Sequence, residues 1–439
     1  MSVRTPAPVA TAPPLARNRN FRLLWTGEGV SVLGSMTTAV VLPLLAVTVF
    51  DAGPLWMGAL TASAWMPWLV VGLPAGAWVD RLDARRVVMV ADLAAAAAVV
   101  SVPTAWALGV LSLPHLALTA AATGTASVFV RTAAPALIPR VVGLEDLPSA
   151  NARLVGTESA MQVAGPGLGG LLVAVVSAAY ALVVDAISFV VSAWCLHRMD
   201  ARALGPSPEL PPRTALRREI AEGVQVVVGD RYLRYFVVQG GIGNFALTGY
   251  GTLLVLFAVR DLGLEPGAVG AMLSLGSAGG LVGAAVATRA VRRWREGRAM
   301  MLLQVLGGPP ALLVAAAQPG WSVVLVPVGM ALVGVGVVGA NVIRGAFRMR
   351  YVPAHLLGRT TSAGSLVAYG TMPLAALLAG WLGAQIGVRE TIGVMACLFA
   401  VASLAVLVGP YGRGRELPTQ PMATCSSGST ATARKSTVT

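Results

Sequence analysis

Apolar runs long enough to cross a lipid bilayer recur along this chain of 439 residues, and no other feature constrains its fold as strongly. A helix needs roughly 20 apolar residues to cross a hydrocarbon core of about 30 Å. We expect an all-α membrane protein of twelve transmembrane helices, which leaves no room for a soluble catalytic domain. The expected spans are 23–48, 57–79, 87–109, 115–138, 153–177, 180–197, 235–258, 266–288, 299–318, 321–346, 361–385 and 391–410.

The distribution of positive charge indicates how the helices are oriented. A net charge of +13 would suggest nucleic-acid binding in a soluble protein. Only 12% of these residues are charged, however, about half the share of an ordinary soluble domain. Arg260 and Arg389 fall in expected outer loops and Arg131 in a span, whereas the other 29 of the 32 basic residues fall in or beside the tails and even-numbered loops. This asymmetry predicts cytoplasmic termini and a lipid-bilayer partner, with no nucleic acid bound.

Targeting signals and cofactor ligands are not evident in the sequence. The first 20 residues are Pro-rich and polar, so we expect no cleaved signal peptide. Cys195, Cys397 and Cys425 lie far apart, which predicts no disulfide framework, metal site or cofactor. Arginine supplies 31 of the 32 basic residues, which suggests a high-GC bacterial genome. We therefore expect a multi-pass protein of the bacterial cytoplasmic membrane.

One long polar interruption divides the expected spans into six and six. Apolar residues at helical spacing within 213–228 predict an amphipathic helix on the membrane surface. The expected order is a cytoplasmic tail, a six-helix bundle, a cytoplasmic linker, a second six-helix bundle and a disordered cytoplasmic tail, at 1–22, 23–197, 198–234, 235–410 and 411–439.

The two halves also resemble each other at one fixed offset. The segment 76–86, GAWVDRLDARR, aligns with 283–293, GAAVATRAVRR, 207 residues later. Pro166 and Pro373 align at the same offset. Two anchors at one spacing predict an internal repeat, and parallel six-helix repeats place a substrate cavity between them near the bilayer midplane. This architecture is typical of a transporter.

The segment 76–86 resembles the loop signature of the major facilitator superfamily. The resemblance implies that the loop closes the cytoplasmic side by contacting the eleventh helix near Arg359. Asp80 would then sit against a helix N-terminus near 359–362. The usual late glycine is replaced around Asp83, and a plain basic topology loop is the alternative. The implied gating residues are Gly76, Asp80, Arg81, Arg85 and Arg86.

A run of glycines around a proline interrupts the fifth expected span. GPGLGG at 165–170 resembles the fifth-helix pattern of drug/proton antiporters in this superfamily. Gly165 and Gly169 share a helix face that admits a close neighbour, Pro166 removes one backbone hydrogen bond, and Gly170 completes the pattern. The alternative is tight static packing.

Other segments are similar to the macrolide-efflux and enterobactin-exporter branch of that superfamily. They are 20–45, 134–154, 183–193 and 350–367, within a resemblance that covers about 20–410. The branch implies a monomeric drug:proton antiporter rather than an enzyme.

Charged residues inside a span are costly and are candidates for function. Glu28, Glu158 and Arg131 are expected at similar depth, where a carboxylate could exchange an arginine partner for a proton. A structural pair, or a contact between Glu28 and a substrate cation, is the alternative. Asp92 is expected to contact the Arg85/Arg86 loop, and Asp185 to cap the outer end of its helix.

A cavity for large amphipathic ligands is mostly apolar with a few polar groups. The candidates to line it, each of which could equally be a packing residue, are Trp65, Trp68, Gln239, Asn244 and Phe245.

These features together predict a secondary transporter that exports hydrophobic or amphipathic small molecules, such as an antibiotic or a siderophore-like metabolite. No P-loop motif is present, so the expected energy source is proton antiport with alternating access. An importer or symporter of the same fold is one alternative. A non-transport membrane enzyme or assembly protein is the other.

Overall fold

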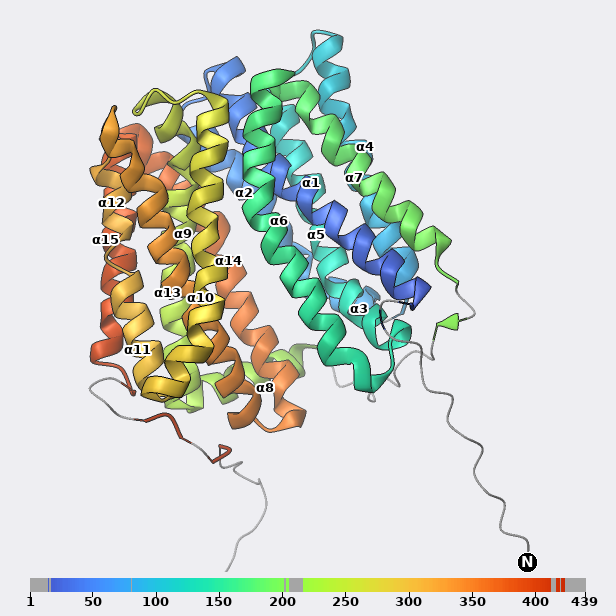
Figure 1. Cartoon of the computed structure of the whole chain (residues 1–439), viewed down its shortest axis with the longest axis vertical. Helices are drawn as coiled ribbons and strands as arrows, with labels where there is room; N and C mark the ends of the chain where they lie inside the picture. The colour runs from blue at the N-terminus through green and yellow to red at the C-terminus, as the bar shows by residue number, and fades with distance from the viewer. Residues whose placement is uncertain are drawn as a thin grey trace, which may run out of the picture.

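The computed structural model describes residues 15, 17–79, 81–200, 203–204, 216–411, 416–418 and 420–422, and every regular element among them is helical (Figure 1). The first part of the chain forms α1 Arg19–Phe50, α2 Pro54–Val70, α3 Gly72–Val79, α4 Ala84–Ala107, α5 Leu113–Val141, α6 Leu147–Val175 and α7 Ala178–Arg198. The second part forms α8 Leu216–Gly229, α9 Arg231–Arg260, α10 Pro266–Trp294, α11 Glu296–Gly307, α12 Ala311–Ala316, α13 Leu325–Tyr351, α14 Ala354–Ile386 and α15 Val388–Leu404.

Ten helices of the described chain are long and apolar enough to cross a membrane, with α11 and α12 counted as one. The other two expected spans correspond to α2 with α3, and to α6. The span expected at 57–79 is divided after Val70. Pro74 has no N–H to donate to the Val70 carbonyl, so the helix is interrupted there and restarts as α3.

Side-chain caps set several helix starts near the ends of the expected spans. The Asn18 side chain accepts from the N–H of Phe21 before α1, and Asp83 accepts from the N–H of Arg85 before α4. Asp230 accepts from the N–H groups of Tyr232 and Leu233 before α9. These oxygens satisfy amide groups that have no partner inside the helix.

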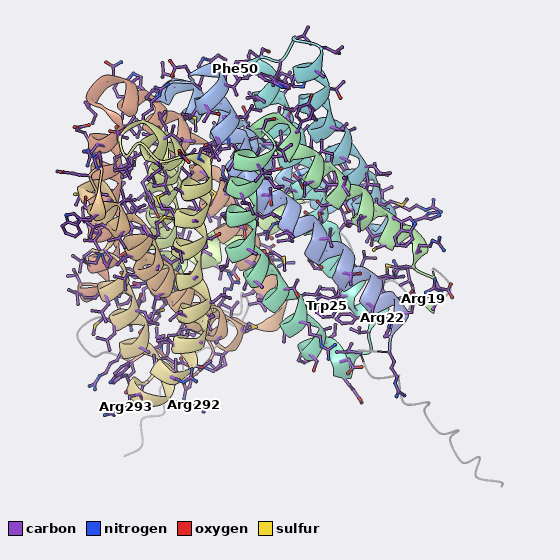
Figure 2. The ribbon with its side chains drawn as sticks, turned by 45° about the horizontal axis from the view of Figure 1, so that its top comes forward. Arg19, Arg22, Trp25, Phe50, Arg292 and Arg293 are labelled. Carbon is purple, nitrogen blue, oxygen red and sulfur yellow. The ribbon has the colours of Figure 1, made fainter. Side chains whose placement is uncertain are left out.

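The helices form two bundles that meet along two seams. The first bundle is α1–α7 and the second is α9–α15, with α2 packed on α14 and α6 packed on α10. Figure 1 shows the bundles together at the top and spreading apart toward the bottom, where α8 lies. Arg19, Arg22, Arg292 and Arg293 lie at the lower end and Phe50 at the upper end (Figure 2). We call these the arginine-rich end and the opposite end.

The buried apolar core follows the same division. One cluster is shared by both bundles and includes Leu45 and Leu182 of the first with Leu253 and Ile392 of the second. Nearer the arginine-rich end each bundle has its own cluster. That of the first bundle includes Phe21 and Leu137, and that of the second includes Phe236, Phe347 and Tyr411. The bundles are therefore joined by burial of apolar surface toward the opposite end.

Candidate functional site

A cavity of about 400 Å³ lies between the two bundles. Trp65 and Asn244, two of the expected lining residues, are part of its wall. Five helices supply the lining, which is mainly apolar with a few hydroxyl and amide groups. The other lining residues are Ala39 and Pro43 of α1, Thr61 of α2, Leu247, Thr248, Gly251, Thr252, Leu254 and Val255 of α9, Leu273 of α10 and Met372 of α14.

The remaining aromatic candidates lie outside the lining of this cavity. The Trp68 ring centre is 4.4 Å from that of Tyr369 on α14, and the Trp65 ring stacks on the same tyrosine at 6.0 Å. Phe245 packs against the shared apolar cluster. Tyr369 was not among the residues expected from the sequence, because nothing in the sequence shows that α2 and α14 are neighbours.

The glycine-proline stretch lies where α6 is wedged between α1 and α10. A β-carbon built on Gly165 would lie 2.4 Å from the Met36 β-carbon, and one on Gly169 would lie 2.9 Å from the Thr37 carbonyl oxygen. On the other side, the Ser274 hydroxyl of α10 donates to the Val163 carbonyl at 2.6 Å. The expected shared face of Gly165 and Gly169 is thus packed on α1, while Gly170 faces the second bundle.

The charged candidates of the first bundle are brought together. Arg131 of α5 donates to a Glu158 carboxylate oxygen of α6 at 3.0 Å, with side-chain exposures of 52% and 34%. Glu28 of α1 is half-buried and within Coulombic range of both. The close packing of α1 on α6 brings them together, and Trp25 donates from its indole N–H to the Thr157 hydroxyl at 2.7 Å.

The carboxyl groups of Asp92 and Asp185 have surroundings that differ from those expected from the sequence. Asp92 is 1% exposed and lies beside Ser192, but neither of its oxygens has a hydrogen-bond partner among the described residues. It is therefore buried in the bundle, and its expected contact with the Arg85/Arg86 loop is wrong. The cause is helix phase, because this position of α4 faces α7 rather than the loop.

Asp185 does not cap a helix either. The carboxyl is fully buried, and α7 begins seven residues earlier at Ala178. One oxygen accepts from the Ser188 hydroxyl at 3.0 Å and the other has no described partner. A β-carbon on Gly34 would lie 2.3 Å from the bonded oxygen, so the glycine makes room for it. Serines three and seven residues after Asp185, on the same helix face, were a usable sequence signal for this buried polar cluster.

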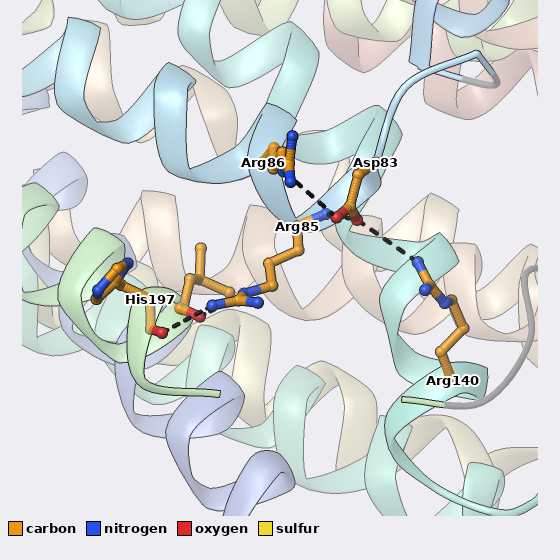
Figure 3. A network of polar contacts seen from close by, with 6 residues as sticks. Asp83, Arg85, Arg86, Arg140 and His197 are labelled. Carbon is orange, nitrogen blue, oxygen red and sulfur yellow. Dashed lines mark hydrogen bonds and ion pairs between the residues drawn. The ribbon is translucent and has the colours of Figure 1, made fainter. Parts of the chain in front are cut away.

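A polar network within the first bundle involves the loop residues Asp83, Arg85 and Arg86 (Figure 3). Arg85 donates to the carbonyls of Leu196 and His197, at 2.6 and 2.7 Å, at the end of α7. Arg86 and Arg140 approach the Asp83 carboxylate at 3.9 and 3.6 Å. This network joins α4, α5 and α7 at the arginine-rich end.

The other expected gating residues have different surroundings. Arg81 is exposed, and a β-carbon on Gly76 would meet nothing within 4 Å. Asp80 lies outside the described residues. Arg359 forms an ion pair of 2.5 Å with Glu222 of α8, so its described partner is the linker helix. The helix start expected near 359–362 is wrong, because α14 begins at Ala354, after Pro353.

A second, smaller cavity of about 90 Å³ lies within the second bundle. Gln239, the remaining candidate, lines this cavity, and Asn244 lines both. Arg344 on α13 also lines it and was not among the candidates, because it lies near the end of the expected tenth span, 321–346, and resembles a basic end-of-span residue. Within the described residues, no three potential metal-ligating side chains lie together.

The family model of the Major Facilitator Superfamily matches residues 24–376. The multidrug efflux pump Tap of Mycobacterium tuberculosis (strain ATCC 25618 / H37Rv) is 29% identical over 412 residues, covering 90% of this chain and 92% of the relative. Tap of Mycolicibacterium fortuitum is 27% identical over 369 residues, covering 81% and 87%.

Solved structures share the fold at low sequence identity. A mutant form of the nucleoside transporter NupG matches with a TM-score of 0.72 at 11% identity, covering 89% of this chain and 99% of that chain. A bacterial homologue of the iron transporter ferroportin in its inward-facing state matches at 0.68 and 19% identity, covering 90% and 98%. Its outward-facing state, soaked with iron, matches at 0.59 and 18% identity, covering 88% and 97%.

Proposed function

The chain belongs to the major facilitator superfamily, a transporter family, and forms a multi-pass protein of the bacterial cytoplasmic membrane; from this premise we propose that it exports hydrophobic or amphipathic small molecules in exchange for protons. One observation carries this proposal: the cavity between the bundles is large and mainly apolar, as a site for amphipathic ligands should be. The relatives named multidrug efflux pumps support the same direction of transport.

The proposed topology has twelve spans in two six-helix halves, 23–197 and 235–410. The α2–α3 pair and α6 complete the ten apolar helices to twelve. We place the arginine-rich end in the cytoplasm, because basic residues are retained on that side of a membrane. The tails 1–22 and 411–439 and the linker 198–234, which contains α8, then face the cytoplasm.

Alternating access is the proposed mode of transport, and the conformation described above would be open to the cytoplasm. The shared apolar core and the α2–α14 and α6–α10 seams lie toward the opposite end, whereas the polar contacts described for Asp83, Arg85 and Arg86 are with α5 and α7 of their own bundle and within the loop. The better match to the inward-facing than to the outward-facing ferroportin homologue supports this assignment. In the outward-open form, residues of the 76–86 loop would approach α14 near Arg359.

For proton coupling we retain Glu28, Glu158 and Arg131. The 3.0 Å ion pair and the neighbouring Glu28 place two carboxyl groups around one guanidinium. Protonation of one carboxyl would release Arg131 from it, so the charge state of the cluster depends on the proton gradient. The cluster is partly exposed, which leaves a route for protons.

Everted membrane vesicles provide the test. An imposed pH gradient, acid inside, should drive accumulation of some members of a panel of antibiotics and dyes, and an ionophore that collapses the gradient should abolish it. Glu28→Gln and Glu158→Gln are compared with wild type. Loss of gradient-driven accumulation with retained binding of the same compound in one variant identifies the coupling carboxyl.

Glu145→Gln is the matched control, because Glu145 is an exposed carboxylate between α5 and α6. Unchanged transport in both cluster variants would assign the cluster a structural role. Movement of the panel out of the vesicles with the gradient would indicate a symporter. Absence of gradient-dependent movement for any compound would contradict export and favour an assembly role.

A further inference from the structure

The 90 Å³ cavity inside the second bundle contains an unusual charged group. Arg344 is the one charged residue among those that line it. The wall is otherwise made of amide, hydroxyl and apolar side chains, with glycines of α9, α11 and α13 that leave the space open. The amide groups are those of Gln239, Asn244, Gln304 and Asn341.

The Arg344 guanidinium has no acidic partner among the described residues. One terminal nitrogen donates to the Gln239 side-chain oxygen at 2.9 Å, and the guanidinium carbon lies 5.5 Å from the centre of the Phe236 ring. The buried Nε has no hydrogen-bond partner. Its charged neighbour is another arginine, Arg348, one turn further along α13, whose Nε is also buried and without a partner. Buried arginines are normally paired, so this one has donor capacity to spare.

The site adjoins the cavity between the bundles. Asn244 and Leu247 of α9 line both cavities. A ligand with its apolar body beside Trp65 could therefore extend a small polar group toward Arg344. A water molecule takes up about 30 Å³ of liquid, so 90 Å³ accommodates a group of carboxylate size.

We propose that Arg344, assisted by Gln239, binds an acidic group of the transported molecule, so that the substrates are amphiphiles bearing a carboxylate or a similar oxyanion. The planar guanidinium presents paired N–H groups that match the two oxygens of a carboxylate. An anion there also neutralises a charge that the bundle leaves uncompensated. This inference rests on the proposed export function, because it identifies the ligand as a transported molecule. The test measures binding alone.

The test uses two probes of the same shape, 2-naphthoate and the neutral 2-naphthamide. Purified full-length protein in phosphatidylcholine nanodiscs is titrated with each, without any gradient, by isothermal calorimetry. Wild type should bind the acid about 10- to 100-fold more tightly than the amide, as expected for a charge-assisted pair in a desolvated site. Arg344→Gln should remove that preference and leave the amide affinity unchanged. Arg344→Lys should retain part of the preference.

Arg350→Gln is the control, because Arg350 lies two turns further on α13 and pairs with Glu296 at 2.7 Å, away from the cavity lining. Its acid preference should equal that of wild type. Equal affinities for both probes in wild type would overturn the proposal. An unchanged preference for the acid in Arg344→Gln would also overturn it. So would a monodisperse Arg344→Lys protein that binds neither probe.

The two proposals fail separately. Gradient-driven export without acid preference would leave export standing and refute the Arg344 site. Acid preference without gradient-driven transport would support the Arg344 site and contradict the proposed export.

Discussion

Gly170 of α6 and Gly270 of α10 face each other so closely that a β-carbon built on Gly170 would lie 2.6 Å from the Gly270 α-carbon. Gly58 and Gly380 form a similar contact between α2 and α14, with 3.0 Å between the built β-carbon and the facing α-carbon. Both contacts join the bundles toward the opposite end, so the interface at these points is made by backbone packed on backbone.

Gly170→Leu should weaken that closure. Overpacking costs about 1–3 kcal/mol, and about 1.4 kcal/mol corresponds to a tenfold change in an equilibrium. We expect about a tenfold faster reaction of a single cysteine at Thr248, which lines the central cavity, with a membrane-impermeant maleimide added outside the cell. Gly156→Leu, also in α6 but with nothing within 4 Å of its built β-carbon, should leave the rate unchanged. Equal rates in both variants would show that this seam does not hold the opposite end closed.

Asp92→Asn should leave the protein as stable as wild type or more stable. The substitution keeps the shape of the side chain and removes the cost of burying a carboxylate without a basic partner. The measurement is apparent Tm by tryptophan fluorescence in detergent. Asp185→Asn should raise the apparent Tm less than Asp92→Asn, because the Ser188 hydroxyl already donates to the Asp185 carboxyl. A lower Tm for Asp92→Asn would mean that the carboxylate has a favourable partner.

Arg85→Ala should destabilise the first bundle. The side chain donates to the Leu196 and His197 carbonyls in the last turn of α7, at the negative end of the helix dipole. The Leu196 carbonyl also accepts from the Met199 N–H at 3.2 Å. We expect a loss of about 1–2 kcal/mol, measured as a lower denaturant midpoint. Arg86→Ala, whose side chain is 82% exposed, should have no measurable effect. Equal midpoints for both variants would contradict the capping role.

The Arg131–Glu158 pair should contribute little to stability. Half-exposed ion pairs are screened by water, so a double-mutant cycle with Arg131→Gln and Glu158→Gln should give a coupling energy below about 1 kcal/mol. Unfolding in urea measures it. A coupling energy of several kcal/mol would assign the pair a structural role and weaken the case for proton exchange.

The sequence predicts where the helices of this fold lie along the chain better than it predicts which helices and side chains contact one another. Span positions and the amphipathic helix near 213–228 are predicted from apolar periodicity, and α8, Leu216–Gly229, overlaps that range. The break between α2 and α3 depends on a single proline in an apolar run and was not predicted. Asp92 and Asp185 were assigned from their distance to a span end, but helix phase buries them.

For the candidate site, too, the sequence indicates individual residues but not which helices bring them together. Trp65 and Asn244, which line the central cavity, could be named from the sequence because aromatic and amide residues in a span are conspicuous. Tyr369 and Arg344 depend on which helices meet, and one sequence contains no such information. Arg359 was expected to contact the first bundle and instead pairs with α8, because the described conformation spreads the bundles apart at that end.

The glycine contacts between the bundles bear on the energy that a conformational cycle needs. When a contact of backbone on backbone forms, no side-chain rotamers lose freedom. When it separates, little side-chain surface becomes exposed. Opening and closing such a seam therefore changes the free energy only modestly. A membrane potential supplies about 2.3 kcal/mol per elementary charge per 100 mV. A seam built this way fits the proposed exchange for one or a few protons per cycle, because a tightly interlocked interface would need more free energy to separate.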